Sequence, residues 1–581
     1  MKTPLLSIAI CLVAIAHADV NYKLKYQRDP SVMKIEITAI ANSDTTVAKI
    51  PNWAPGAYIL QNFAGGVKEF KVTQPGLDSI NVDNPKPNVW SFGTEKGKPF
   101  TVTYTVGVGI DSEIIHFSGP STYLYLEGRK GEKCNLSLEI PSEWASACGL
   151  DSAGSVPHSF TAPDYDTLAD NPVTAGKFEM DTYLVERKPH YVVYRGKAVE
   201  KLDRKKVVSV LQKITETCSK FFGGLPYKKY VWHFNVFDSP DGGGGLEHLS
   251  STQISLSSGF GPRVQSVCAH EFFHLWNVKR VRSFVLGPFQ YDELPKTGAL
   301  WWLEGVTDYY ASLLMLRSGL WDDKQFLEDA VRNITTTRNN AERFNVSIFD
   351  SSFRVGEANN GRGNSSGFGV NYYNSGWVAG FALDLELRAR TNSKHSLDDV
   401  EMALWNMCRD GKPGFQETEI RKLLVMYGGE PMGPVYDKWV ALPGDVQIED
   451  ALAKAGYQII TRTENYLSLG IDYRPDPDRK GVRVTRAFGP SAGKFMANDL
   501  ITSIGDQSLA GLTPGGLRAV FDGVKADVPV RVMATREGAP DVNLQITPAL
   551  FTRDVKEIKD VPAISSEQSA VRKAWRNGRG S

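Results

Sequence analysis

Two histidines four residues apart constrain this chain more than any other feature. They are His270 and His274, with Glu271 directly after the first, in the stretch VCAHEFFHLW at residues 267–276. Apolar residues recur at helical spacing around them, and no Gly or Pro interrupts residues 263–282, so we predict a helix here. Four residues are a little over one helical turn, so both imidazoles project from one face and can bind one metal ion.

Two imidazoles on one helix face suit zinc, which accepts nitrogen ligands plus a carboxylate and keeps a further position for water. Bound zinc makes that water acidic, and Glu271 is then placed to accept its proton. A five-residue pattern of this kind also arises by chance. The alternative interpretation is a pair of partly buried histidines on an amphipathic helix.

A second stretch, LWWLEGVTDYY at residues 300–310, favours the metal site. It places Glu304 inside an apolar and aromatic helix, where an unpaired charge is costly. Glu304 is therefore expected either in a salt bridge or on a metal ion. Asp308 lies four residues further on, on the same helix face, and could accept the second N–H of a ligating histidine and so orient its ring.

Composition excludes several classes of protein. A chain of 581 residues is too long for one hydrophobic core, so we expect two to four domains. The formal net charge is zero and 23% of residues are charged, which gives no electrostatic argument for binding nucleic acid or an anionic membrane. No stretch is apolar enough to span a bilayer.

The first residues have the pattern of a cleavable signal peptide. A positive start and a short apolar run end in Ala16-His17-Ala18, which predicts cleavage before Asp19. Removing residues 1–18 leaves five of the six cysteines, an odd number that is no disulfide framework, although one bridge such as Cys134–Cys148 could form. The short signal and the few cysteines favour a secreted or periplasmic bacterial protein.

The residue pattern changes along the chain and predicts a multidomain α+β protein. Residues 19–185 alternate like strands and predict an antiparallel β-sandwich, and residues 186–460 carry the histidines and predict a mainly helical domain. Residues 463–551 contain short strands and one helix, as in a small α+β or barrel-like module. The polar and basic residues 552–581 are expected to be disordered.

A run of four glycines precedes the predicted helix that carries His270 and His274, in DGGGGLEH at residues 241–248. It lacks the Lys-Ser/Thr ending and the directly following helix of a phosphate-binding loop. We expect Gly244 and Gly245 instead to let the backbone approach an extended peptide substrate closely.

Taken together, these motifs resemble the glycyl aminopeptidase family of secreted zinc peptidases, relatives of aminopeptidase N among the gluzincins. Four motifs occur in the family's order: PNWAPGAY at residues 51–58, GGLEH at 244–248, HEFFH at 270–274 and WWLEGVTDYY at 301–310. The resemblance implies a thermolysin-like catalytic domain, and residues 463–551 look like a PDZ domain.

The resemblance also assigns roles. It implies that His270, His274 and Glu304 bind one zinc ion per chain and that Glu271 is the general base. Glu247 matches the glutamate that holds the free α-amino group of the substrate, a role that suits a carboxylate because it can pair with an ammonium group. Relatives have an asparagine after this glutamate, where this chain has a histidine. The alternative for Glu247 is a solvated loop charge.

Two further assignments come from the resemblance alone. Tyr373 matches the tyrosine that donates a hydrogen bond to the oxyanion, although the neighbouring Tyr372 could take that role and both could simply be core residues. The carboxylate-binding loop of the PDZ-like module would contain Leu469, Gly470 and Ile471. That loop either binds the C-terminal end of a peptide or packs against the catalytic domain.

The function implied is hydrolysis of N-terminal residues, preferentially Gly or Ala, from peptides with a free N-terminus. One alternative is a zinc endopeptidase whose PDZ-like module recruits protein substrates. A second alternative is a non-catalytic peptide-binding protein that uses only the PDZ-like module. The sequence alone does not separate exopeptidase from endopeptidase.

Overall fold

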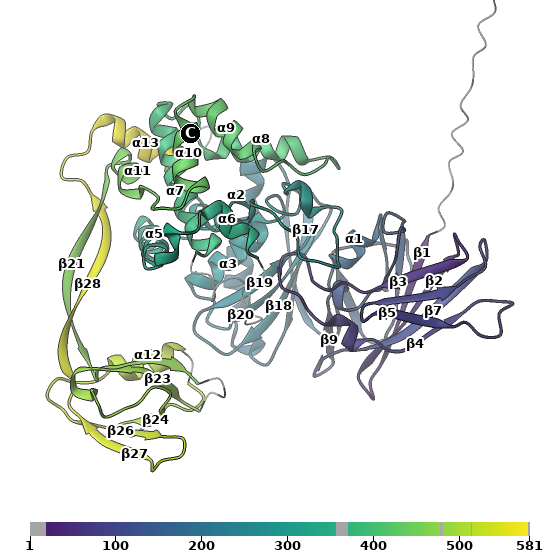
Figure 1. Cartoon of the computed structure of the whole chain (residues 1–581), viewed down its shortest axis with the longest axis horizontal. Helices are drawn as coiled ribbons and strands as arrows, with labels where there is room; N and C mark the ends of the chain where they lie inside the picture. The colour runs from purple at the N-terminus through teal and green to yellow at the C-terminus, as the bar shows by residue number, and fades with distance from the viewer. Residues whose placement is uncertain (1–18, 356–369, 477, 479, 513, 579–581) are drawn as a thin grey trace, which may run out of the picture. The chain divides into compact units, whose positions relative to one another are not determined.

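A computed structural model describes residues 19–355, 370–476, 478, 480–512 and 514–578. The chain forms two compact units (Figure 1). Within the described ranges, the larger unit contains Met1–Phe326, Asn333–Ala451 and Ala570–Ser581, and the smaller unit contains Leu327–Arg332 and Leu452–Ser569. The predicted signal peptide, residues 1–18, lies outside the described residues.

The N-terminal part of the larger unit is rich in β-structure, as its alternating sequence predicted. A seven-stranded sheet has the order β13-β14-β11-β1-β2-β7-β4, and two four-stranded sheets have the orders β10-β3-β6-β5 and β12-β15-β9-β8. The prediction of a purely antiparallel arrangement was wrong in one place, because β1 and β11 pair in parallel. These strands are distant in sequence, so their direction depends on the connections between them rather than on local pattern. The elements are β1 (Val20–Gln27), β2 (Val32–Ile40), β3 (Thr45–Lys49), β4 (Lys68–Thr73), β5 (Val82–Lys86), β6 (Val89–Gly93), β7 (Pro99–Gly107), β8 (Ile110–Asp111), β9 (Ile114–Phe117), β10 (Tyr125–Leu126), β11 (Cys134–Glu139), β12 (Ala145–Cys148), β13 (Asp151–Ser152), β14 (Ser159–Ala162), α1 (Tyr165–Ala169) and β15 (Val173–Gly176).

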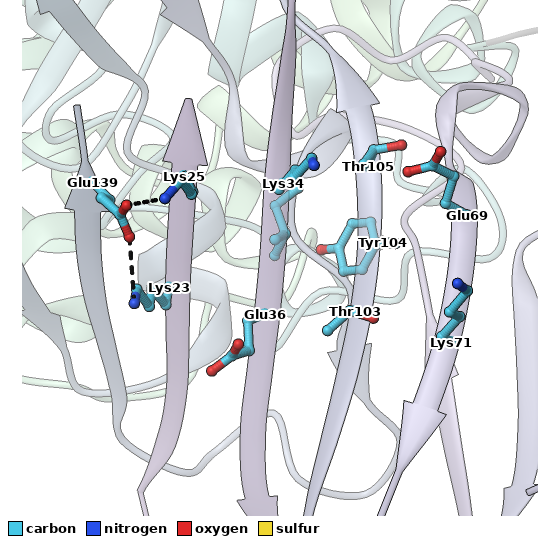
Figure 2. Close-up of a pocket in the computed structure, with 11 residues that line it drawn as sticks. Lys23, Lys25, Lys34, Glu36, Glu69, Lys71, Thr103, Tyr104, Thr105 and Glu139 are labelled. Atoms are coloured by element: carbon cyan, nitrogen blue, oxygen red, sulfur yellow. Dashed lines mark hydrogen bonds and ion pairs between the residues drawn. The ribbon is translucent and has the colours of Figure 1, made fainter. Parts of the chain in front are cut away.

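Alternation of burial along β1 and β2 explains why this sheet forms. Val20, Tyr22 and Leu24 are buried in the core, while the intervening lysines face outward. Figure 2 shows this outer face, where charged side chains from neighbouring strands gather and Glu139 forms ion pairs with Lys23 and Lys25. Such pairs on an exposed sheet face contribute little to stability, and the buried face supplies most of it.

A five-stranded mixed sheet follows, with the order β16-β17-β18-β20-β19. Its strands are β16 (Glu179–Val185), β17 (Lys188–Arg195), β18 (Tyr230–Phe237), β19 (Gly243–Glu247) and β20 (Ser251–Ser257). The predicted domain boundary after residue 185 was wrong, because β16 already pairs with β17 in this sheet. Three of the four glycines of the run, Gly243 to Gly245, belong to the edge strand β19, which pairs antiparallel with β20.

Helices make up most of the rest of the larger unit (Figure 1). The α2 helix begins after Asp203, whose side chain accepts a hydrogen bond from Lys206 N, and ends at Gly223 in the left-handed conformation. The helices are α2 (Arg204–Phe222), α3 (Pro262–Phe273), η5 (Trp301–Val306), α4 (Thr307–Arg317), α5 (Asp323–Arg338), α6 (Ile348–Phe353), α7 (Tyr372–Arg390), α8 (Leu397–Cys408), α9 (Glu419–Gly428), α10 (Met432–Tyr436), η8 (Asp437–Ala441) and α11 (Ile448–Lys454).

The smaller unit contains a two-stranded ribbon and a compact sheet. In the ribbon, β21 (Tyr457–Ser468) pairs antiparallel with β28 (Ala549–Asp560) over their whole length. The sheet has the order β22-β23-β24-β26-β27, with β25 paired to β24, and one helix, α12, belongs to the same module. Its further elements are β22 (Ile471–Pro475), β23 (Val482–Ala487), β24 (Leu500–Ile504), β25 (Gln507–Ser508), α12 (Pro514–Asp522), β26 (Val530–Thr535) and β27 (Val542–Ile546). The predicted module limits of 463 and 551 therefore cut through both strands of the ribbon.

The described part of the C-terminal segment, residues 552–578, forms the end of a strand and a helix, so the prediction of a disordered tail was wrong for these residues. Its first residues complete β28, and a helix follows, α13 (Ser566–Asn577), with Val571 and Trp575 buried. Trp575 is 1% exposed, and its indole N–H donates to the hydroxyl of Tyr309 at 2.9 Å. The prediction relied on the polar and basic composition of the segment. A single deeply buried tryptophan can order a segment that is otherwise polar.

Two other expectations concern cysteines and membranes. Cys134, Cys148, Cys218, Cys268 and Cys408 are all free and buried, so the bridge between Cys134 and Cys148 does not form. Cys134 pairs in β11 and Cys148 in β12, which belong to different sheets. Among the described residues, no helix combines the length and the apolar character needed to cross a membrane.

Candidate metal centre

The α3 helix brings the two histidines together. Pro262 opens the helix, His270 lies in its last turn, and His274 is the residue at its C-terminal cap. The Nε2 atoms of the two imidazoles are 2.8 Å apart. The helix ends at Phe273 although no Gly or Pro follows before residue 282, because the bonds that follow tighten to i→i−3, as Leu275 N donates to Phe272 O and Trp276 N to Phe273 O.

The outer nitrogen of each ring faces an oxygen acceptor. His270 Nδ1 is 2.7 Å from Asp308 Oδ1, and His274 Nδ1 is 2.6 Å from the carbonyl oxygen of Asn277. Because both facing atoms are acceptor oxygens, a neutral imidazole at either position carries its proton on Nδ1 and keeps a lone pair on Nε2. The expected contact between Asp308 and a histidine of the pair is present in the structure.

Glu304 completes the group from a neighbouring helix. It lies in η5, a π-helical turn of the kind that often occurs at functional sites. Its Oε2 atom is 3.3 Å from His274 Nε2 and 3.6 Å from His270 Nε2, and its Oε1 atom has no hydrogen-bond partner among the described residues. Burial opposes ionisation of Glu304, but the positive charge of His274 and His270 in their protonated forms outweighs it and lowers the pKa of Glu304 to about 2.

These three side chains fit a zinc ion. One donor atom from each of His270, His274 and Glu304 lies within 4.8 Å of the others, and all three residues are buried. Two imidazole nitrogens 2.8 Å apart beside a buried carboxylate require a positive charge between them, supplied either by a shared proton or by a metal ion. Two imidazoles and one carboxylate form the donor set of a catalytic zinc site that keeps a position open.

Glu271 is held beside this group by close packing against the edge strand. A Cβ atom on Gly245 would lie 2.6 Å from Cγ, Cδ and Oε1 of Glu271, so only glycine leaves room for this carboxylate. The Oε2 atom of Glu271 is buried without a hydrogen-bond partner among the described residues. Burial raises the pKa of Glu271 to about 7. A carboxylate with that pKa can both accept and return a proton near neutral pH.

Glu247, at the end of β19, lies close to the metal-binding group. One oxygen of its carboxylate is within 4.8 Å of donor atoms of both Glu271 and His274. The side chain is 4% exposed and burial raises its pKa, so the alternative of a solvated loop charge does not fit the structure. The next residue, His248, faces Asp170 Oδ1 at 3.4 Å, and Lys279 Nζ lies 2.6 Å from the same oxygen.

Tyr373 lies beside His270, with 6.3 Å between the ring centroids. It occupies the first turn of α7, where Asn371 accepts a hydrogen bond from Tyr373 N at 2.8 Å. Burial and the charge of Glu304 raise the pKa of Tyr373 well above its usual value, so its hydroxyl keeps its proton and can donate it in a hydrogen bond.

Two glycines allow α7 to approach η5, the helical turn that carries Glu304. A Cβ on Gly305 would lie 2.3 Å from the carbonyl oxygen of Tyr372, and a Cβ on Gly376 would lie 2.4 Å from that of Trp301. Tyr372 itself is 2% exposed. The backbone carbonyl of Tyr372 therefore faces η5, and the ring of Tyr373 lies beside His270.

Asn277 has a structural role that no sequence motif indicated. This buried side chain donates to Trp302 O at 3.1 Å and Thr307 Oγ1 at 3.0 Å, while its backbone carbonyl holds His274. It therefore links the histidine helix to the segment that carries Glu304. No spacing rule marks it, because its partners lie in a different helix. Gly244, by contrast, faces open space, so the structure assigns it no packing role.

Two segments match known family models. Residues 263–379 match the M61 glycyl aminopeptidase family, and residues 21–177 match the peptidase M61 N-terminal domain. These matches support a peptidase. They cover the histidine helix, Glu304 and Tyr373, as well as the β-rich N-terminal part.

Solved structures resemble the chain as well. The aminopeptidase N family protein from Idiomarina loihiensis has a TM-score of 0.77 and 23% sequence identity, covering 96% of this chain and 99% of that chain. At that identity the likeness establishes the fold. An M1 zinc metallopeptidase from Deinococcus radiodurans has a TM-score of 0.45 and 13% identity over 74% of this chain and 95% of that chain, too little similarity for further argument. No curated protein sequence matches the chain.

Proposed function

We propose that this chain is a zinc metallo-aminopeptidase that removes the first residue from peptides with a free N-terminus. The observation that carries the proposal is the pair of Nε2 atoms 2.8 Å apart beside the carboxylate of Glu304. His270, His274 and Glu304 would hold one zinc ion per chain. Asp308 and the carbonyl of Asn277 would keep the two rings in the tautomer that binds it.

When bound, zinc would supply Lewis-acid polarisation of the substrate carbonyl and would acidify the attacking water. Glu271 accepts the proton of that water and returns it to the leaving amine, in keeping with its pKa near 7. Tyr373 donates a hydrogen bond to the oxyanion, which carries charge only in the transition state.

Glu247 would bind the ammonium group of the substrate. A buried carboxylate beside the metal-binding group gains a strong, charge-assisted partner when an ammonium arrives. A blocked N-terminus cannot supply that partner, which favours removal of single residues over internal cleavage. The exposed edge of β19, which includes Gly244 and Gly245, offers backbone groups to an extended peptide. A preference for Gly or Ala as the first residue is part of the proposal.

Domain organisation and location are also proposals. We infer a signal peptide at residues 1–18 and export to the periplasm or the medium. The smaller unit would be a PDZ-like domain that binds the C-terminal end of a peptide at Leu469, Gly470 and Ile471. Two observations support this binding site. The β22 strand lies at the edge of its sheet, and Gly470 directly before it has a φ of +73°, which suits a tight turn. Neither nucleic acid nor a membrane is an expected partner.

A pair of peptides tests the proposed activity. One begins with a free glycine, the other is identical but N-acetylated, and both are incubated with zinc-loaded protein and followed by mass spectrometry. We expect loss of single residues from the free peptide alone, and no loss with the Glu271→Gln variant. Internal cuts in both peptides would instead show the alternative endopeptidase. Undiminished peptide binding without any cleavage would show a binding protein.

A further inference from the structure

A rigid corner of the N-terminal β-rich part, residues 51–58, reaches the candidate metal centre. Hydrogen bonds join it to the segment between α3 and η5. Asn52 N donates to Tyr291 O and the indole N–H of Trp53 donates to Gln290 O, both at 2.9 Å. Trp53 is 1% exposed. Two prolines and these buried anchors fix the path of the corner.

The backbone of Gly56 in this corner lies directly against Glu247. A Cβ on Gly56 would lie 2.6 Å and 2.7 Å from the two carboxylate oxygens of Glu247 and 2.6 Å from Leu246 Cδ1. Any side chain at position 56 must therefore displace the carboxylate proposed to bind the substrate's amino group. Gly56 also has a φ of +93°, which residues other than glycine rarely adopt.

Tyr58 ends the corner two residues after Gly56. Its ring stacks on Trp53 with 6.2 Å between centroids, and the residue is 4% exposed. Burial raises the pKa of Tyr58 well above its usual value, and the charges of Glu304 and Glu247 raise it further.

We propose that residues 51–58 form the wall of the subsite for the substrate's first residue, and that Gly56 and Tyr58 determine which first residue is accepted. The inference rests on the proposed function, because it takes Glu247 to hold the α-amino group. The amino nitrogen and the side chain share one Cα, so the side chain begins about 2.5 Å from the nitrogen. A wall that touches Glu247 therefore bounds that side chain and favours small ones.

The test compares the specificity of variants on tripeptides that begin with Ala or Phe. Tyr58→Asn and Tyr58→His both shrink the side chain, and both residue types tolerate the left-handed φ of +49° at this position. We expect each to raise the ratio of kcat/KM for the Phe peptide over the Ala peptide, at least tenfold for Tyr58→Asn and at least threefold for Tyr58→His. An unchanged ratio in the folded, zinc-loaded Tyr58→His variant would overturn the proposal.

Gly56→Ala has a matched control in Gly76→Ala. Both glycines have a φ of +93°, but a Cβ on Gly76 would meet only Lys98 Nζ at 3.7 Å. We expect Gly56→Ala to raise KM for the free Ala peptide at least tenfold and Gly76→Ala to change it less than twofold. Equal effects would show that backbone strain, and not contact with Glu247, explains the loss.

The two proposals can fail separately. If the unmodified protein releases no first residue, the proposed function fails. If it does so but the variants keep its specificity profile and its KM, only the proposed role of residues 51–58 fails.

Discussion

Replacing Trp575 by alanine is expected to lower the free energy of unfolding of the larger unit by about 4–6 kcal/mol. The indole is 1% exposed and packs on Phe326 and Phe381, with centroid distances of 4.9 Å and 5.4 Å. Its N–H donates to the hydroxyl of Tyr309, which in turn donates to Asp384. The substitution therefore creates a cavity and removes one buried hydrogen bond.

The magnitude combines two contributions. Truncation of a buried tryptophan to alanine costs about 3–5 kcal/mol, and a buried hydrogen bond contributes about 1 kcal/mol. A domain is stable by only about 5–15 kcal/mol, so the variant is expected to unfold at markedly lower denaturant concentration.

Denaturation followed by circular dichroism measures this loss. Lys573→Ala is the matched control, because Lys573 is exposed on the same helix, and its effect is expected within about 0.5 kcal/mol. A loss below about 1 kcal/mol for Trp575→Ala would refute the reasoning. The C-terminal helix would then not be docked, and the disorder expected from its composition would be correct.

Three further changes have defined outcomes. Asp308→Ala should weaken zinc binding about 10–100-fold, measured by competition with a chelator, because His270 loses the partner that orients it. Burial raises the pKa of Glu401 from 4.5 to about 8, so the folded state keeps a proton that the unfolded state releases, and stability falls as pH rises between these values. The melting temperature of Glu401→Gln minus that of the unmodified protein should therefore become more positive from pH 5 to pH 8. A difference that stays constant over this range would contradict the prediction. Gly245→Ala should lower kcat while zinc content stays unchanged, because its Cβ displaces Glu271.

The sequence predicted those parts of the site that depend on local spacing. Residues four apart on a helix share a face, which was enough to pair His270 with His274. Glu304 followed from the cost of an unpaired charge among apolar neighbours, and the structure places its carboxylate at the two imidazoles.

Features that depend on contacts between distant segments could not be predicted. The link through Asn277 and the approach of Gly56 to Glu247 each join elements far apart in the chain. The same is true of the docked Trp575, since a polar composition says nothing about one buried side chain. The parallel pairing of β1 with β11 likewise depends on long connections.

Zinc stoichiometry tests the central claim most directly. The unmodified protein, Glu304→Gln and Glu401→Gln are loaded with zinc, desalted and analysed for metal per chain. Glu401 is the matched control, because it is an equally buried glutamate of the same unit that bonds to Trp302 at 3.0 Å instead of facing the histidines. We predict one zinc per chain in the unmodified protein and in Glu401→Gln, and far less in Glu304→Gln. Equal zinc in all three proteins, or none in the unmodified protein, would contradict the account.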